Sequence, residues 1–545
     1  MARKALMVIV LMLVGQVIGS MPGTYLQKKV VHYSLSDPAV PKALLREANA
    51  RPWTSKEKGP VADLLAMARE SSGALWLGGK QGAARFAPDE RDRWERWHYF
   101  SGTRWLMDDE VLNIYVQQEE PERRVWLRSK TGISLITWTP MTLAEKAAYY
   151  DDMIEKRKLR HGFVTGSHLR DPRDFSTNVN SDDDNDGLWT AMYMAAQSYC
   201  YAATKSEEAR RKAQRSLKAM LRLEEITGIP GFYARSFKSV DEPAPHGGEW
   251  HPTADGKWLW KGDTSSDESV GHFYGYAIYY DLAADEAEKE TIRRVIRRMT
   301  DHLLQHDYKL VDLDGKATRW GNWDDAFYTT PEGEYEKALR SMELLSFLKT
   351  SYHITGDEKY QKAYWERIQR GYATFTLYYR RWISAEQEIN FSDDELYYLS
   401  VLPLLLYEKD PALRDNFLPG VRFTWQQIRP DYNPLWNFIT VASGAETMDD
   451  KVLHESVRTL QRIPWDMRSW KVSNSHRLDV TMEQAVDRHR QKYLKAVVPP
   501  DERRMHKWNG NPYVADERGN GSHEEAPTFF LLPYWMGRYY GWIKE

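Results

Sequence analysis

The second part of the chain, from residue 143 onward, carries apolar residues at helical spacing in long stretches that short connectors separate. The clearest stretches are 188–223, 269–304, 339–354 and 359–379. The connectors at 228–231, 312–315 and 355–357 are rich in Gly, Pro and Asp, which favour turns. Helix pairs repeated in this way bury their apolar faces against one another, so the pattern predicts a mainly α fold with an (α/α)6-type toroid barrel over residues 141–545.

Two shorter segments before residue 140 resemble each other. Residues 74–78 and 125–128 each place a Trp between apolar residues, and each is followed by a glycine and a second apolar run, at 82–86 and 132–136. This is the pattern of a β-hairpin. Trp76 and Trp126 are 50 residues apart, close to the length of a propeller blade. Two units cannot close a propeller, so we expect a small antiparallel β domain over 22–140 with two propeller-like repeats.

The first twenty residues have the order of a secretory signal peptide. Arg3 and Lys4 precede an apolar run at 5–14, and small residues follow at 15, 19 and 20. The run is too short for a membrane span, which needs about 20 residues. We therefore expect residues 1–20 to be a signal peptide and the protein to be periplasmic or secreted. The single cysteine, Cys200, precludes an intramolecular disulfide and lies in an apolar helical run, where burial as a small hydrophobe is expected.

The charge balance and the aromatic content bear on the partner. The formal net charge is -3, from 75 basic and 78 acidic residues, which argues against nucleic acid as the main partner. The chain contains 22 Trp and 32 Tyr. Flat rings with a polar edge can stack on sugar faces, although most of these residues are expected to fill the core of a large helical domain.

The connector at 181–190 is the most acidic part of the helical region. Its opening matches a calcium-binding loop at Asp182, Asp184, Asp186 and Gly187. The twelfth position, however, is Tyr193, where such a loop requires a bidentate Glu. Calcium as a cofactor is therefore one of three alternatives. The others are Asp side chains that cap a helix, and Asn185 and Asp186 that face a sugar.

The connector at 261–276 carries the strongest candidates for chemistry. Glu268, His272 and Tyr276 are one helical turn apart and share a face. A face with these three residue types indicates a site role for His272, and also for Tyr276 and Tyr274. Helix capping by Ser265 or Ser266 with Glu268 or Ser269 is the alternative explanation for half of this segment.

Other polar connectors carry indoles, amides and carboxylates suited to sugar binding, with ordinary turns as the alternative. Their candidate residues are Trp320, Asn322 and Trp323, then Asp394, then Trp436 and Asn437, and finally His476 and Arg477. Arg160 and His161 precede the acidic connector. The recurrence of such residues between helices favours a carbohydrate-binding barrel.

Residues 184–190, 262–268 with 271–274, and 433–437, together with the closing 531–539, resemble the (α/α)-barrel enzymes of bacterial glycan degradation, specifically the rhamnose-glucuronate lyases of polysaccharide lyase family 27. The sheet region resembles propeller-type repeats that precede such barrels. The resemblance implies β-elimination at a glucuronate, with release of a capping L-rhamnose from an arabinogalactan-type glycan. The expected partner is thus an oligo- or polysaccharide that contains glucuronic acid.

That chemistry needs donors that neutralise the uronate carboxylate, a base and an acid. We expect His272 to be the base and Tyr274 or Tyr276 the acid, with His161 in reserve. The residues available to donate hydrogen bonds to the uronate carboxylate are Arg160, Arg477, Asn185 and Asn322. The full set of expected substrate-binding residues is Arg160, Asn185, Asp186, Trp189, Asp267, Glu268, Trp320, Asn322, Trp323, Asp394, Trp436, Asn437, His476 and Arg477. No residue is assigned as a metal ligand.

Two other functions fit the same residues. A glycoside hydrolase acting on uronic-acid-containing glycans would use a pair of carboxylates, available among Asp186, Asp267, Glu268, Asp324 and Asp394. A non-catalytic glycan-binding protein would use the aromatic connectors alone. Product absorbance in the near ultraviolet separates the first two functions, because only a lyase forms an unsaturated uronide.

Overall fold

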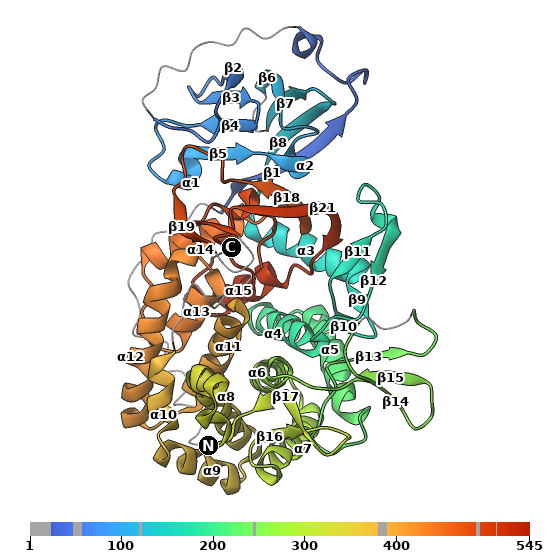
Figure 1. Ribbon diagram of the computed structural model, residues 1–545, viewed down its shortest axis with the longest axis vertical. Helices are drawn as coiled ribbons and strands as arrows, with labels where there is room; N and C mark the ends of the chain where they lie inside the picture. The colour runs from blue at the N-terminus through green and yellow to red at the C-terminus, as the bar shows by residue number, and fades with distance from the viewer. Residues whose placement is uncertain are drawn as a thin grey trace.

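The computed structural model describes residues 23–46, 57–118, 122–243, 247–379, 390–486, 491–507 and 509–544. Two antiparallel sheets lie at one end of the molecule and a ring of helices at the other (Figure 1). The expected signal peptide at 1–20 lies outside the described residues. Within them, no helix is both long and apolar enough to cross a membrane.

The two sheets have four strands each. The first has the order β1-β8-β7-β6, from Tyr25–Tyr33, Ile133–Met141, Arg123–Ser129 and Val111–Gln118. The second has the order β2-β3-β4-β5, from Leu64–Arg69, Leu75–Gly79, Gly82–Phe86 and Trp97–Phe100. Both predicted hairpins are therefore present, as β3–β4 and β7–β8.

The two sheets share one hydrophobic core. Trp76 of β3 is fully buried and stacks on Phe100 with ring centroids 5.2 Å apart. Its edge meets Trp138 of β8 at 5.5 Å. Trp126 of β7, which matches Trp76 in the repeat, instead packs on Tyr33 of β1. Only one of the two repeated indoles thus joins the sheets, and strand β1 supplies the partner of the other.

Six inner helices contact one another in a closed ring, in the order α4, α6, α8, α11, α13, α15 and back to α4. Their bounds are Asp186–Thr204, Ser266–Leu282, Pro331–Thr355, Phe391–Tyr407, Pro434–Ala442 and Thr528–Tyr539. An outer helix precedes each inner one: α3, α5, α7, α9, α12 and α14, at Leu143–Arg157, Glu207–Glu225, Glu286–Gln305, Glu358–Gln369, Pro411–Ile428 and Asp450–Arg462. This is the toroid of helix pairs that the apolar spacing predicts.

The two longest apolar stretches of the sequence are each a pair of helices with a tight break, whereas 339–354 lies within the single helix α8. The stretch 188–223 divides at Lys205, whose φ of 60° lies in the left-handed region and ends α4. The stretch 269–304 divides before α7, where Asp285 and Glu288 form a capping box. Local capping chemistry therefore determines where the chain reverses between the inner and outer layers.

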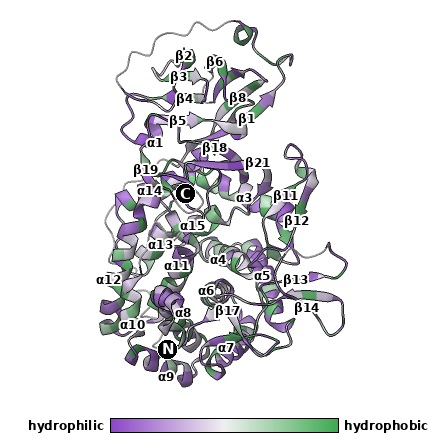
Figure 2. Ribbon diagram, viewed as in Figure 1, coloured by the Kyte–Doolittle hydropathy of each residue, from purple (hydrophilic) through white to green (hydrophobic). Residues whose placement is uncertain are grey.

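Burial separates the two layers of helices. Inner helix α6 is buried on nearly all its faces from Ser266 to Tyr279, whereas outer helix α7 buries only one face. Figure 2 shows hydrophilic turns along outer helices such as α7 and α12. The inner helices are therefore free to expose polar groups only at their ends.

The C-terminal part of the chain links the ring to the sheets. Strands β18 (Arg468–Ser473) and β21 (Asp516–Glu524) form one sheet with β11 (Ser167–Leu169) and β12 (Asn178–Asn180) between the two regions (Figure 1). Short helices α1 (Arg93–Arg96), α2 (Gly102–Trp105) and α10 (Tyr372–Phe375) and two-residue strands β9 (Leu159–Arg160) and β10 (Phe163–Val164) fill the connections. The remaining strands are β13 (Ser236–Ser239), β14 (Trp250–Pro252), β15 (Trp258–Lys261), β16 (Lys309–Val311), β17 (Ala317–Asn322), β19 (Met482–Val486) and β20 (Lys492–Leu494).

Candidate active-site cavity

The N-terminal ends of four inner helices, α4, α6, α8 and α11, border one cavity of about 380 Å³. Its charged lining residues are Asp183, Asp184, Asp267, Glu336, Asp393, Arg235, Arg340 and Lys507. Its other lining residues are Asn185, Asn390, Asn509, Ser265, Ser266, Ser392, Leu396, Trp189 and Trp320. Carboxylates, amides and indoles thus converge where the inner helices begin.

Asp393, in the first turn of α11, is the carboxyl group with the most altered acidity in this lining. Burial raises its pKa well above the ordinary value, and the nearby Glu336 raises it further, while Arg340 acts in the opposite direction. Asn390 donates a hydrogen bond from Nδ2 to Asp393 Oδ1 at 2.8 Å. Asp393 therefore keeps its proton to a higher pH than an ordinary carboxyl group and is suited to donate it inside the cavity.

An ion-pair network on α8 orders the side of the cavity that this helix forms. Arg340 donates to Glu336 at 2.6 Å and to Glu343 at 3.2 Å. Trp323 donates its indole N–H to the same Glu343 oxygen at 2.7 Å. Burial raises the pKa of Glu343 to about 7 against the effect of Arg340. This network fixes the position of Arg340 and Glu336 at the cavity.

Asp267 and Asp183 are the other carboxylates that lie half-buried in the lining. Asp267 is at the start of α6 and makes no hydrogen bond or ion pair with the residues that the structure describes. Asp183 accepts a hydrogen bond from the backbone N–H of Asp184 at 2.6 Å. Asp267 lines the cavity from α6 and Asp183 from the connector before α4, whereas Asp393 belongs to α11.

Two indoles provide flat surfaces in the cavity. Trp189 is half-buried, and the ammonium of Lys507 lies 4.8 Å from its ring centroid. Within the described part of the chain, the indole N–H of Trp189 is buried without an acceptor. Trp320 is half-buried and stacks with the guanidinium of Arg319 at 4.4 Å. Rings in this arrangement can stack on sugars, and the free N–H of Trp189 can donate to a hydroxyl.

Glu268 is fully buried behind the cavity lining and stabilises the start of α4. Its Oε1 accepts hydrogen bonds from the backbone N–H groups of Gly187 at 3.0 Å and Leu188 at 3.4 Å, so the side chain from α6 caps helix α4. A Cβ atom at Gly187 would lie 2.0 Å from Glu268 Oε2, which explains the glycine at this position. The alternative of local capping by Ser265 is not found, because Ser265 makes no side-chain capping bond and Glu268 instead caps the neighbouring helix α4.

Four of the expected substrate-binding residues line the cavity: Asn185, Trp189, Asp267 and Trp320. Two more, Asp186 and Glu268, lie fully buried directly behind the lining. Asp186 pairs with Arg160 at 2.5 Å and accepts from Ser236 at 2.5 Å. Burial raises the pKa of Asp186 to about 6, although Arg160 lowers it. Arg160 therefore neutralises a buried carboxylate instead of lying among the lining residues.

The expected catalytic group on α6 lies in the core and away from the cavity lining. His272 is fully buried, donates from Nδ1 to the carbonyl oxygen of Glu268 at 2.8 Å, and stacks on Tyr233 at 4.5 Å. Burial lowers its pKa to about 4. Tyr274 and Tyr276 are also fully buried. Glu268, His272 and Tyr276 do share a helix face, but all three side chains on that face are fully buried, with Glu268 bonded to the start of α4.

The remaining expected residues are dispersed. His161 is bonded to Glu242 at 2.5 Å on the surface, and Asn322 donates to the backbone of its own turn. Trp323, Asp394, Trp436 and Asn437 are buried, with Trp436 stacked on Tyr398 and Asn437 bonded to Trp425 and Ser456. His476 and Arg477 contact Tyr99 near the sheets. The structure does not bring these residues to the cavity.

The acidic connector does not form a calcium loop. The three carboxylates that match the calcium-loop pattern are each paired with a cation: Asp182 with Lys238, Asp184 with Lys261 and Arg235, and Asp186 with Arg160. Within the described ranges, no group of three or more His, Cys, Asp or Glu residues could hold a metal ion. Cations of the protein therefore occupy the positions where a metal ion would be needed.

Sequence reasoning missed several lining residues, above all Glu336, Arg340, Asp393 and Lys507. Glu336 and Arg340 are one turn apart at the start of a helix, which reads as an ordinary surface ion pair. Asp393 precedes Asp394, and the acidic helix start that they share was the one available signal. Lys507 reaches the cavity only through the fold of the C-terminal segment.

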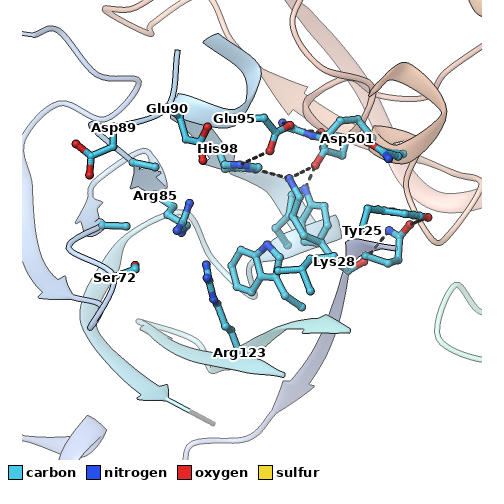
Figure 3. A pocket seen from close by; sticks show the side chains of 18 of the residues that line it. Tyr25, Lys28, Ser72, Arg85, Asp89, Glu90, Glu95, His98, Arg123 and Asp501 are labelled. Carbon is cyan, nitrogen blue, oxygen red and sulfur yellow. Dashed lines mark hydrogen bonds and ion pairs between the residues drawn. The ribbon is translucent and has the colours of Figure 1, made fainter. Parts of the chain in front are cut away.

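A second cavity of about 390 Å³ lies between the sheets and the C-terminal segment. Figure 3 shows Arg85 and Arg123 on one side and the linked side chains of Lys28, His98, Glu95 and Asp501 on the other. Lys28 contacts His98 at 2.7 Å and pairs with Asp501, and Arg462 pairs with Asp501 at 2.8 Å. Arg85 makes a bidentate pair with Glu70 at 2.8 and 2.9 Å. These charges satisfy one another and fasten the sheets to the helical ring.

No protein-family model and no curated protein sequence matches the chain. Among solved structures, the chain is similar to a sugar epimerase from a ruminal bacterium, with 10% identity, 72% of this chain and 99% of that chain covered, and a TM-score of 0.39. It is similar to a mutant thermostable endoglucanase from Alicyclobacillus acidocaldarius, with 10% identity, 87% and 98% covered, and a TM-score of 0.39. It is also similar to a metagenome-derived glycoside hydrolase family 9 endoglucanase, with 12% identity, 95% of this chain and 98% of that chain covered, and a TM-score of 0.38. Likenesses of this size do not assign the chain to a family.

Proposed function

We propose that the protein is a carbohydrate-active enzyme that cleaves a glycan in the cavity at the ends of the inner helices. The observation that carries the proposal is the convergence of Asp393, a carboxyl group with a raised pKa, with further carboxylates and two indoles in one cavity. A non-catalytic binding protein needs the indoles but gains nothing from a carboxyl group with a raised pKa.

Hydrolysis is the reaction that this lining supports best. Glycoside hydrolases need one protonated carboxyl group to donate to the leaving oxygen and one carboxylate to act as base or nucleophile. Asp393 fits the first role. Asp267, which has no partner among the described residues, fits the second, and Asp183 is the other available carboxylate. Trp189 and Trp320 would position the sugar on either side of the bond.

β-Elimination at a glucuronate, with release of a capping L-rhamnose, is the second candidate. It is favoured by Arg340 and Lys507, cations that could neutralise a uronate carboxylate. Burial lowers the pKa of Lys507, but Glu525 and Asp183 raise it more, so the ammonium is a poor base. The described lining contains neither His nor Tyr, so the base would also have to be a carboxylate.

The test is a product assay on the purified protein. Glycans with and without glucuronate, a rhamnose-capped arabinogalactan among them, are incubated with the protein while released sugar and near-ultraviolet absorbance are followed. Sugar release without absorbance supports hydrolysis, and release with rising absorbance supports elimination. If Asp393→Asn cleaves as fast as the wild type in either case, the proposed site is wrong.

A further inference from the structure

A smaller cavity of about 220 Å³ adjoins the candidate active site, and Lys507 lines both. Its charged lining residues are Arg503, Arg504, Lys507, Glu517, His523 and Glu525. None of these residues belongs to the inner helices that border the larger cavity. The C-terminal segment therefore forms this smaller cavity beside the candidate active site.

Arg503 is the unusual residue of this pocket. Its side chain is buried, with 6% of its surface exposed, and its Nε donates to the carbonyl of Val498 at 2.7 Å. Its Nη2 is also buried, and no described residue offers that nitrogen an acceptor. Burial lowers the pKa of Arg503 to about 10, which Asp431 only partly offsets. A buried guanidinium with an unpaired N–H donor lowers the stability of the fold unless an anion accepts a hydrogen bond from it.

The other charges of the pocket do not supply that anion. Glu525 is engaged by Lys507 at 3.3 Å and by His523 at 3.0 Å. Glu517 lies 3.6 Å from Arg504, and burial raises its pKa although Arg504 lowers it. Three cationic side chains thus face two carboxylates, both already paired. The pocket has a surplus of positive charge and an unfilled guanidinium edge.

We propose that this smaller cavity binds the anionic group, a carboxylate or a sulfate, of a sugar residue that is next to the residue held in the larger cavity. A guanidinium edge binds the planar or tetrahedral oxygens of such groups through paired hydrogen bonds. The inference rests on the proposed function, because the two cavities share Lys507 and one glycan can occupy both. It assigns to the enzyme an acidic glycan whose charged residue is recognised outside the catalytic cavity.

The test is calorimetric titration of the full-length protein with three monosaccharides: glucuronate, glucose 6-sulfate and neutral glucose. We expect at least one acidic sugar to bind about tenfold tighter than glucose, or more, and the stronger of the two identifies the anionic group. Arg503→Gln should weaken that binding roughly 10- to 100-fold, in line with a charge-assisted hydrogen bond. Arg518→Gln, an exposed arginine on the same strand as Glu517, should leave it unchanged.

If Arg503→Gln does not fold, Arg504→Gln serves in its place, because Arg504 is only partly buried; binding of the acidic sugar should weaken severalfold. The inference is overturned if both acidic sugars bind no tighter than glucose, or if the folded variants bind them as the wild type does. The test is independent of catalysis. If acidic sugars bind but the protein cleaves no glycan, the inference about the pocket holds and the proposed function is wrong. If the protein cleaves only neutral glycans, the proposed function holds and the inference is wrong.

Discussion

The cavity under the two sheets and the cavity at the ends of the inner helices have similar volumes, about 390 and 380 Å³, and both contain buried charges. Under the sheets, Lys28, Asp501 and Arg462 form mutual pairs. At the helix ends, burial raises the pKa of Asp393 and so favours its neutral form. Asp267 has no partner among the described residues.

The difference separates charges that hold the fold from groups that can act on a ligand. The pKa of Asp501 is lowered, since Arg462 and Lys28 together outweigh the effect of burial. Such a pair contributes to stability only while both partners remain charged. A carboxyl group with a raised pKa contributes no such pairing, and its proton is available for transfer. Changes in the two cavities should therefore affect different properties of the protein.

The largest effect is expected from Asp393→Asn. The amide keeps the shape of the neutral carboxyl group but cannot donate its proton to a leaving oxygen. We expect kcat to fall by about 10²- to 10⁴-fold with little change in the free energy of unfolding. The measurement is sugar release at saturating glycan. Asp415→Asn, an exposed change on outer helix α12, is the matched control and should keep full activity.

Asp501→Asn should act in the opposite way. It leaves the buried Lys28 and Arg462 without their shared carboxylate, and loss of one partner from a buried pair costs about 3–5 kcal/mol. We expect the free energy of unfolding in denaturant to fall by that order, while kcat per folded molecule stays near the wild-type value. An unchanged denaturation midpoint would show that the junction charges do not hold the sheets to the ring.

The two carboxyl groups predict opposite pH responses. Activity that needs protonated Asp393 is lost as pH rises through its raised pKa, by about tenfold per unit beyond it. The stability from Asp501, whose folded pKa is lowered, is present above the unfolded value of about 3.9 and is lost as pH falls below it toward the folded pKa. Rate profiles and unfolding curves across pH check both, and a rate that rises through neutral pH would contradict the role of Asp393.

A smaller effect is expected from Trp320→Ala. The indole contacts Arg319 and lies half-buried at the cavity, so its loss should remove stacking on a sugar and little else. Aromatic contacts of this kind contribute about 0.5–1.5 kcal/mol beyond their buried area, so KM should rise roughly twofold to tenfold at an unchanged unfolding midpoint. A change in stability without a change in KM would assign Trp320 to the fold.

Much of the fold follows from local patterns in the sequence. Apolar spacing predicts the helix pairs, and the Trp-containing repeats predict the hairpins β3–β4 and β7–β8. The site follows only in part. Asn185, Trp189, Asp267 and Trp320 follow from the expectation that the helix starts and connectors of such a ring carry its polar residues. Asp393, Glu336 and Lys507 meet them only through closure of the ring and the return of the C-terminal segment, which no local pattern encodes.

His272 shows the limit of reading a helix face from spacing. Positions four residues apart do place Glu268, His272 and Tyr276 on one face, but spacing does not reveal what that face meets. In α6 every face is packed, and His272 stacks on Tyr233 in the core. For an inner helix of a ring, the end and not the face is the place to look for chemistry.

The most direct test measures kcat per folded molecule and the free energy of unfolding for Asp393→Asn and Asp501→Asn side by side, with the glycan that the product assay identifies. We predict a crossed result, in which Asp393→Asn loses activity but keeps its stability and Asp501→Asn loses stability but keeps its activity. An Asp393→Asn protein that is fully active, or one that is inactive only because it unfolds, would contradict the assignment of the active site to the ends of the inner helices.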